Sequence, residues 1–151
     1  MRMDRPRLFL VAIVLVIFLS VISGCTSNEV ARLPIQAPGD YFIEFDHDGQ
    51  PVELWTDLDI EYIEATELWY QIEFFIDGNL VQSVRCDPLS ADFRLMPREA
   101  EVRGVTKLSY LASMGCEVDL PEGKIEAQVT LHAQGGQVQL FRADLIINYR
   151  D

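Results

Sequence analysis

Apolar and polar residues alternate along several stretches of this chain, and this period of two constrains the fold more than any other feature. Successive side chains of a β-strand point to opposite faces, so the alternation predicts strands with one buried and one exposed face. The longest stretch covers residues 52–62, whose expected inner side consists of Val52, Leu54, Thr56, Leu58, Ile60 and Tyr62. We therefore expect the chain to fold mainly as β-sheet.

Turn residues separate this stretch from further predicted strands. Residues 68–76 alternate, and Asp77-Gly78 then supplies the positive φ angles of a two-residue hairpin that returns through residues 80–85. Residues 125–131 alternate as well, and a turn at Gly135-Gly136 precedes a last strand. That last strand is expected over residues 138–149. Shorter strands are expected over 41–46, 93–96 and 107–111, and a short helix near Arg98–Val102. Seven to eight strands predict an all-β antiparallel β-sandwich over residues 41–151.

Two short motifs resemble bacterial immunoglobulin-like domains. Residues 72–81 read I-E-F-F-I-D-G-N-L-V, and residues 120–127 read L-P-E-G-K-I-E-A. The chain departs from that family at Ile125, where an aromatic residue or histidine is commoner, and it has a long insert between the motifs. The resemblance implies an immunoglobulin-like sandwich that binds, spaces or presents, since such domains are rarely catalytic. Fold alone does not decide function.

The first 24 residues are typical of a secretory signal peptide. Arg2, Arg5 and Arg7 precede an unbroken apolar run over Leu8–Leu19, which is shorter than the roughly 20 residues of a membrane span. The run closes on Ile22-Ser23-Gly24-Cys25, which resembles the lipobox of bacterial lipoproteins. The alternative is an ordinary signal peptide with a chance cysteine.

The lipobox resemblance implies how and where the chain is anchored. Cleavage before Cys25 would leave a cysteine with diacylglycerol on its thiol and an acyl chain such as palmitate on its amine, which fixes the protein to a lipid bilayer. Thr26 follows, rather than the aspartate that retains lipoproteins at the inner membrane. The implied location is the cell envelope, at the outer membrane facing the periplasm. Residues 25–40 are expected to form the lipidated cysteine and a flexible tether.

Two cysteines remain if Cys25 is lipidated. Exported proteins fold in an oxidising compartment, so Cys86 and Cys116 are expected to form a disulfide. Apart from the lipid on Cys25, no cofactor is expected.

Acidic residues are concentrated in the first half of the predicted domain. The chain has a net charge of −12, which argues against a nucleic-acid partner. Between Leu33 and Val84 there are 12 carboxylates and no lysine or arginine. The expected outer side of the strand over 52–62 is an acidic ridge formed by Glu53, Trp55, Asp57, Asp59 and Glu61. This ridge is either a docking surface for a basic protein or a solvated face that keeps an edge strand from pairing.

Other candidate sites are weaker. Asp46 and Asp48, with Asp57, suggest a loose calcium site, although a turn between strands is the favoured interpretation. His47 and His132 are expected at the surface, and no catalytic motif surrounds either of them. Trp69 and Phe75 share the outer side of the strand over 68–76, where they are expected to be covered; the alternative is an exposed binding stripe.

These observations predict a membrane-anchored, non-enzymatic binding or assembly accessory of the envelope that acts through its acidic sheet face. The alternative is an inhibitor of a cationic envelope-attacking enzyme such as lysozyme, with acidic loops entering the cleft of the target.

Overall fold

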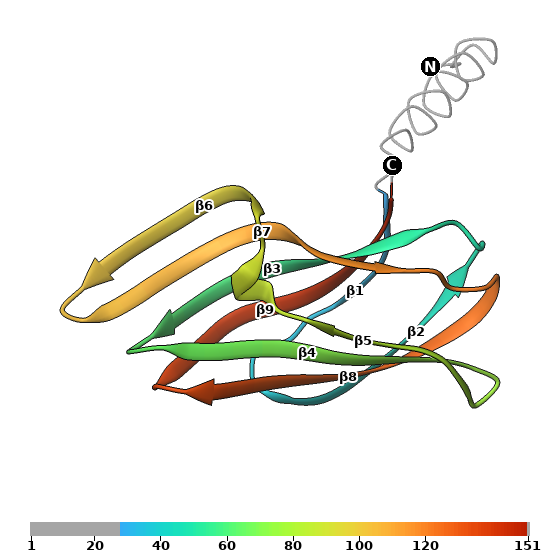
Figure 1. Cartoon of the computed structure of the whole chain (residues 1–151), viewed down its shortest axis with the longest axis horizontal. Helices are drawn as coiled ribbons and strands as arrows, with labels where there is room; N and C mark the ends of the chain where they lie inside the picture. Colours follow the sequence, from blue (N-terminus) through green and yellow to red (C-terminus); the bar gives the residue numbers. More distant parts are fainter. Residues whose placement is uncertain (1–27, 151) are drawn as a thin grey trace, which may run out of the picture.

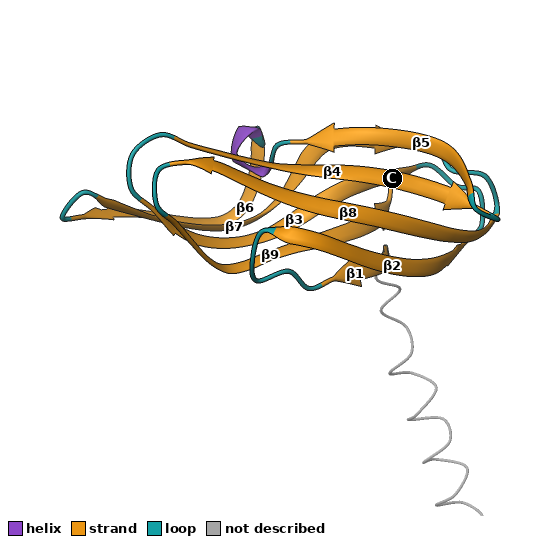
Figure 2. Ribbon diagram, turned by 90° about the horizontal axis from the view of Figure 1, so that it is seen from below, coloured by secondary structure: helices purple, strands orange, loops and turns teal. Residues whose placement is uncertain are grey.

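The structure, a computed structural model, describes residues 28–150, which form two packed antiparallel sheets (Figures 1 and 2). Sheet A contains, in spatial order, β1 (Glu29–Leu33), β9 (Val138–Tyr149), β3 (Val52–Tyr62), β7 (Val105–Val118) and β6 (Phe93–Val102). Sheet B contains β2 (Gly39–His47), β8 (Gly123–Gly135), β4 (Thr66–Ile76) and β5 (Asn79–Cys86). The predicted all-β sandwich is confirmed, with nine strands within residues 28–150 rather than seven or eight.

The alternation in the sequence is reproduced as burial. In β3, every second residue from Val52 to Ile60 is buried, and the residues between them are partly exposed. β4 shows the same pattern from Leu68 to Phe74. The buried sides of the two sheets face each other and form the core, so the remaining side of each sheet is free for other roles.

Both predicted turns are confirmed. Asp77 and Gly78 have φ angles of 49° and 77° and connect β4 to β5. The turn at Gly135-Gly136 carries the chain from β8 in sheet B to β9 in sheet A. A Cβ atom on Gly136 would lie 1.8 Å from the carbonyl oxygen of Ile63, so no other residue fits there.

Two predicted segments are wrong. The helix expected near Arg98–Val102 is the second half of strand β6, which pairs with β7 through a turn at Arg103-Gly104. A helix of so few residues is unstable alone, whereas β7 supplies a full ladder of backbone partners. The described part of the tether expected over residues 25–40 is also structured, because β1 pairs with β9, Ile35 is completely buried and β2 begins at Gly39. The folded domain begins at Glu29 instead of residue 41.

A buried tyrosine links the two sheets by hydrogen bonds. The hydroxyl of Tyr70 in β4 donates to the carbonyl of Ala143 in β9 at 2.7 Å and lies 2.9 Å from Oγ1 of Thr56 in β3. Both side chains are fully buried. Burial raises the pKa of Tyr70 well above its ordinary value, so the neutral hydroxyl that these bonds need is the form present.

We expect Tyr70→Phe to lower the free energy of unfolding by about 1–3 kcal/mol, because it leaves a buried carbonyl and a buried hydroxyl without their partner. Urea denaturation would measure the loss. The matched control is Tyr41→Phe, which removes a hydroxyl that donates to the carbonyl of Ala37 at 2.7 Å in an exposed position. Water replaces that bond, so equal losses in the two variants would contradict the prediction.

Candidate binding faces of the two sheets

The acidic ridge lies on the outer side of sheet A. Its members are Glu53, Trp55, Asp57, Asp59 and Glu61, all partly exposed on β3, which confirms that they share one face. The suggestion that they protect an edge strand is wrong, because β3 pairs with β9 on one side and with β7 on the other.

Neighbouring strands bring basic side chains to this ridge. Asp57 lies 2.9 Å from Nε of Arg142 and 3.5 Å from Nη1 of Arg32. Glu61 lies 2.6 Å from Nζ of Lys107. Arg32 also contacts Asp144 at 3.4 Å, and hydrogen bonds to Glu29 raise the pKa of its guanidinium. The ridge is therefore a mixed ionic surface instead of a uniformly negative one.

The outer side of sheet B carries more unbalanced negative charge. Alternation with the buried residues of β2, β4 and β8 places six carboxylates there: Asp40, Glu44, Asp46, Glu67, Glu73 and Glu126. The basic residues of this face are Lys124 and Arg85. Within residues 28–150, the ion pair between Lys124 and Glu44, at 2.9 Å, is the only one on this face. The pairing raises the pKa of Lys124.

Two carboxylates occupy directly opposed positions on the outer side of sheet B. Glu44 of β2 is directly opposite Glu126 of β8, and like charges at opposed positions destabilise a sheet. Gln128, two residues further along β8, lies between Phe42 of β2 and Glu73 of β4. Lys124 pairs with Glu44, so Glu126 is the member of this opposed pair left without an ion-pair partner among the described residues. It lies near a third carboxylate, Glu73, and an aromatic ring.

Aromatic side chains accompany these carboxylates. Phe42 is 53% exposed, and Phe75 is partly exposed next to Glu126. Trp69 stacks on His132 with ring centroids 4.8 Å apart, and the guanidinium of Arg85 lies 4.5 Å from the Trp69 ring centroid. The expectation that Trp69 and Phe75 are fully covered is wrong, since sheet B is an outer layer.

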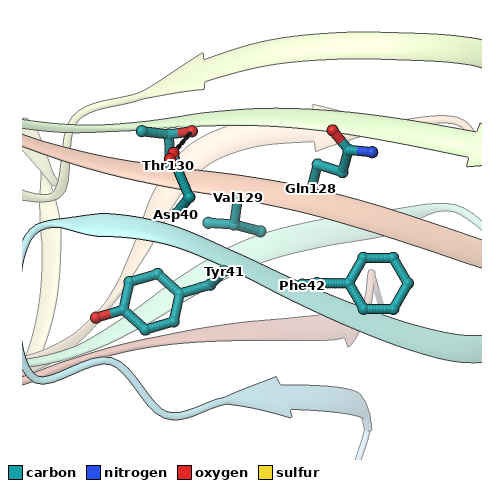
Figure 3. Close-up of a pocket in the computed structure, with 6 residues that line it drawn as sticks. All are labelled: Asp40, Tyr41, Phe42, Gln128, Val129 and Thr130. Carbon is teal, nitrogen blue, oxygen red and sulfur yellow. Dashed lines mark hydrogen bonds between the residues drawn. The ribbon is translucent and has the colours of Figure 1, made fainter.

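A shallow depression lies on this face between β2 and β8, as Figure 3 shows. It has a volume of about 470 Å³ and is lined by Asp40, Tyr41, Phe42, Gln128, Val129 and Thr130. Oγ1 of Thr130 donates to Asp40 at 2.7 Å, which fixes that carboxylate at the rim. These residues carry no motif that marks them in the sequence, although the alternation along β2 and β8 places their polar members on one face.

The loose calcium site does not assemble. Asp48 caps its own turn by accepting hydrogen bonds from the backbone and side chain of Gln50, and the backbone bond lowers the pKa of Asp48. Asp46 is on the outer side of sheet B, whereas Asp57 is on the outer side of sheet A. Among the described residues, no group of three or more histidine, cysteine or carboxylate side chains is placed to hold a metal ion.

The two histidines differ. His47 was expected at the surface, but it is only 4% exposed. The Gly49 amide donates to its Nδ1 at 3.1 Å, and its Nε2 lies 2.8 Å from the carbonyl oxygen of Gln50. This side chain therefore fixes the turn after β2. His132 is partly exposed and packs on Trp69.

The disulfide between Cys86 and Cys116 is confirmed. It joins β5 of sheet B to β7 of sheet A, with Cα atoms 6.0 Å apart. Cys25 and the predicted signal peptide lie outside the described residues.

No model of a known protein family matches this chain, and no curated protein matches it in sequence. In the part that the structure describes, no helix is long and apolar enough to cross a membrane.

Proposed function

We propose that this protein is a lipid-anchored, non-enzymatic binding protein of the bacterial cell envelope, and that it holds a basic protein partner on the outer side of sheet B. The proposal moves the binding surface from the acidic ridge on β3 to the opposite face of the sandwich. The hairpin residues that resemble bacterial immunoglobulin-like domains form β4 and β5 of this same sheet, which is consistent with a role in binding or presentation.

The observation that carries the proposal is the set of unpaired carboxylates beside exposed aromatic rings. Glu73 and Glu126 have no ion-pair partner among the described residues, and Phe42 adds exposed apolar surface next to them. Lysine or arginine side chains of a partner would neutralise Glu73 and Glu126 and could also stack on the rings. On the acidic ridge, by contrast, Arg142, Arg32 and Lys107 already supply that positive charge.

The test is capture of partners from detergent-solubilised membranes by the full chain, compared with the variant Glu73→Gln/Glu126→Gln. We expect the wild type to recover a basic protein at low salt and to lose it as the ionic strength rises, because exposed charges are screened within about 8 Å at physiological salt. The variant should bind that partner at least tenfold more weakly.

The matched control is Asp59→Asn/Glu61→Gln, which removes the same number of negative charges, two, from the acidic ridge. This control should bind like the wild type. Loss of the partner in the control alone would place binding on the ridge and overturn our assignment to sheet B. Recovery of partners that neither salt nor either variant changes would refute the acidic-face proposal, whereas added lysozyme as the sole bound protein would favour the inhibitor alternative.

A further inference from the structure

Strand β6 exposes apolar side chains at the edge of sheet A. Phe93 is 60% exposed, Met96 is 77% exposed and Val102 is 51% exposed, with Leu95 between the first two. The hairpin of β6 and β7 projects beyond the other turns at its end of the sandwich in both views (Figures 1 and 2). Exposed apolar groups that gather in one place are typical of interaction sites.

The cross-strand register connects these side chains to the outer side of sheet A. Phe93 is opposite Ser113, which is opposite Trp55, and Leu95 is opposite Leu111. Trp55 is partly exposed, and its buried Nε1 has no hydrogen-bond partner in the structure. Phe93, Leu95 and Leu111 therefore form an apolar band on β6 and β7. Ser113, which donates a hydrogen bond to Glu53, lies between this band and Trp55 of β3.

Charges beside this band are balanced. A depression of about 340 Å³ is lined by the carboxylates of Asp57 and Asp59, the guanidinium groups of Arg98 and Arg142, and Met96, Ser109, Tyr110 and Leu111. A symmetric dimer brings the same patch of two molecules together, so its surface must be complementary to itself. A patch with equal numbers of both signs meets this requirement. The outer side of sheet B, with six carboxylates and two basic residues, would repel its copy.

The backbone edge of β6 is unsuited to pairing with another strand. Pro97 has no amide hydrogen, and the register shifts between Leu95 and Arg98, where Met96 has a φ of 49°. Prolines and bulges are devices that prevent edge-to-edge pairing. Contact through the face of the sheet is therefore favoured over extension of the sheet.

We propose that a second copy of this chain packs on the outer side of sheet A, in a symmetric dimer centred on Phe93, Leu95 and Met96. A twofold axis parallel to the strands would place the first residues of both β1 strands at the same end of the dimer. Both molecules could then share one membrane, and both sheet B faces would stay accessible. This inference does not depend on what sheet B binds.

Sedimentation equilibrium of the full chain in density-matched detergent tests the proposal. We expect a species of twice the mass of one chain, and we expect Phe93→Ser/Met96→Ser to raise the dimer dissociation constant at least tenfold. Leu80→Ser/Val81→Ser is the matched control, because these residues of β5 are exposed apolar side chains outside the proposed interface. The control should remain dimeric, and both variants should keep the wild-type far-UV circular dichroism spectrum, which reports folding of each chain.

A photo-crosslinking amino acid at position 96 of the membrane-bound chain provides a second measurement. It should give a product of two chains, whereas the same group at position 80 should not. A monomeric wild type, a dimer that survives the Phe93/Met96 substitutions, or a crosslink at position 96 only to a different protein would each overturn the proposal.

Discussion

The double variant Cys86→Ala/Cys116→Ala should lower the free energy of unfolding by about 2–4 kcal/mol. The cysteines are 30 residues apart in sequence, and the bond between them restricts the unfolded chain. In the folded state the bond also ties β5, an edge strand that pairs only with β4, to β7 of the other sheet. Urea denaturation should show a midpoint about 1–2 M lower than that of the wild type.

Removing the disulfide should also lower the stability of one region of the structure more than that of the rest. Without the disulfide, β5 keeps its ladder to β4 but loses its covalent link to sheet A, so we expect amide hydrogen exchange to accelerate first over residues 79–90. A reductant should produce the same midpoint shift in the wild type and no shift in the double variant. A wild type that keeps its midpoint while both thiols are free would contradict the prediction.

The sequence was sufficient to predict strands wherever burial follows the period of two. Residues 52–62 and 68–76 are strands at the positions expected, because each has one side in the core. The second half of β6, Arg98–Val102, was not predicted as a strand. All of these residues are exposed, so they show no sustained alternation of apolar and polar residues that would indicate a strand. β1 was not predicted for a different reason. It is only five residues long, and its strand conformation depends on pairing with β9.

The charge pattern was misleading because linear sequence does not show which strands become neighbours. Asp57 is far in sequence from Arg32 and Arg142, yet β1 and β9 bring both guanidinium groups to it. The sequence correctly placed the ridge on one face, but its neutralisation depends on the strand order of sheet A. His47 illustrates the same limit, since its burial depends on contact with residues 49–50 and with Pro121.

The substitution Cys25→Ser should abolish lipid modification, because the thiol is the acceptor in the lipobox chemistry that residues 22–25 suggest. The N-terminal peptide of the mature wild-type chain should begin at Cys25 and carry acyl mass, whereas the variant should carry none by mass spectrometry. Each buried methylene contributes about 0.8 kcal/mol to membrane binding, and stable anchoring needs more than one chain or a second signal. Loss of the lipid should therefore remove the lipid anchor, while the uncleaved signal peptide stays on this variant.

Among the described residues, the end of the domain nearest Cys25 carries acidic side chains. Glu29 is the fourth residue after Cys25, so the lipid would hold the start of β1 within about 14 Å of its attachment point. The backbone of Asn28 bonds to Tyr149 and that of Arg150 bonds to Pro51, which places the turn after β2 at this same end. That turn carries the carboxylate of Asp48, and the carboxylate of Glu117, at the end of β7, forms an ion pair with Arg150. A basic cluster that would bind anionic lipid is not formed by these residues.

Release from the membrane needs a variant that is still cleaved, because Cys25→Ser alone leaves the signal peptide attached. Ile22→Ala/Gly24→Ala/Cys25→Ser creates a cleavage site of small residues typical of ordinary signal peptides. We expect this variant to be recovered in the soluble fraction of the envelope and the wild type to be recovered in the detergent phase. If the cleaved variant stays with membranes after a carbonate wash, or if wild-type Cys25 carries no lipid, the anchor proposal is refuted, whatever the outcome of the partner and dimer experiments.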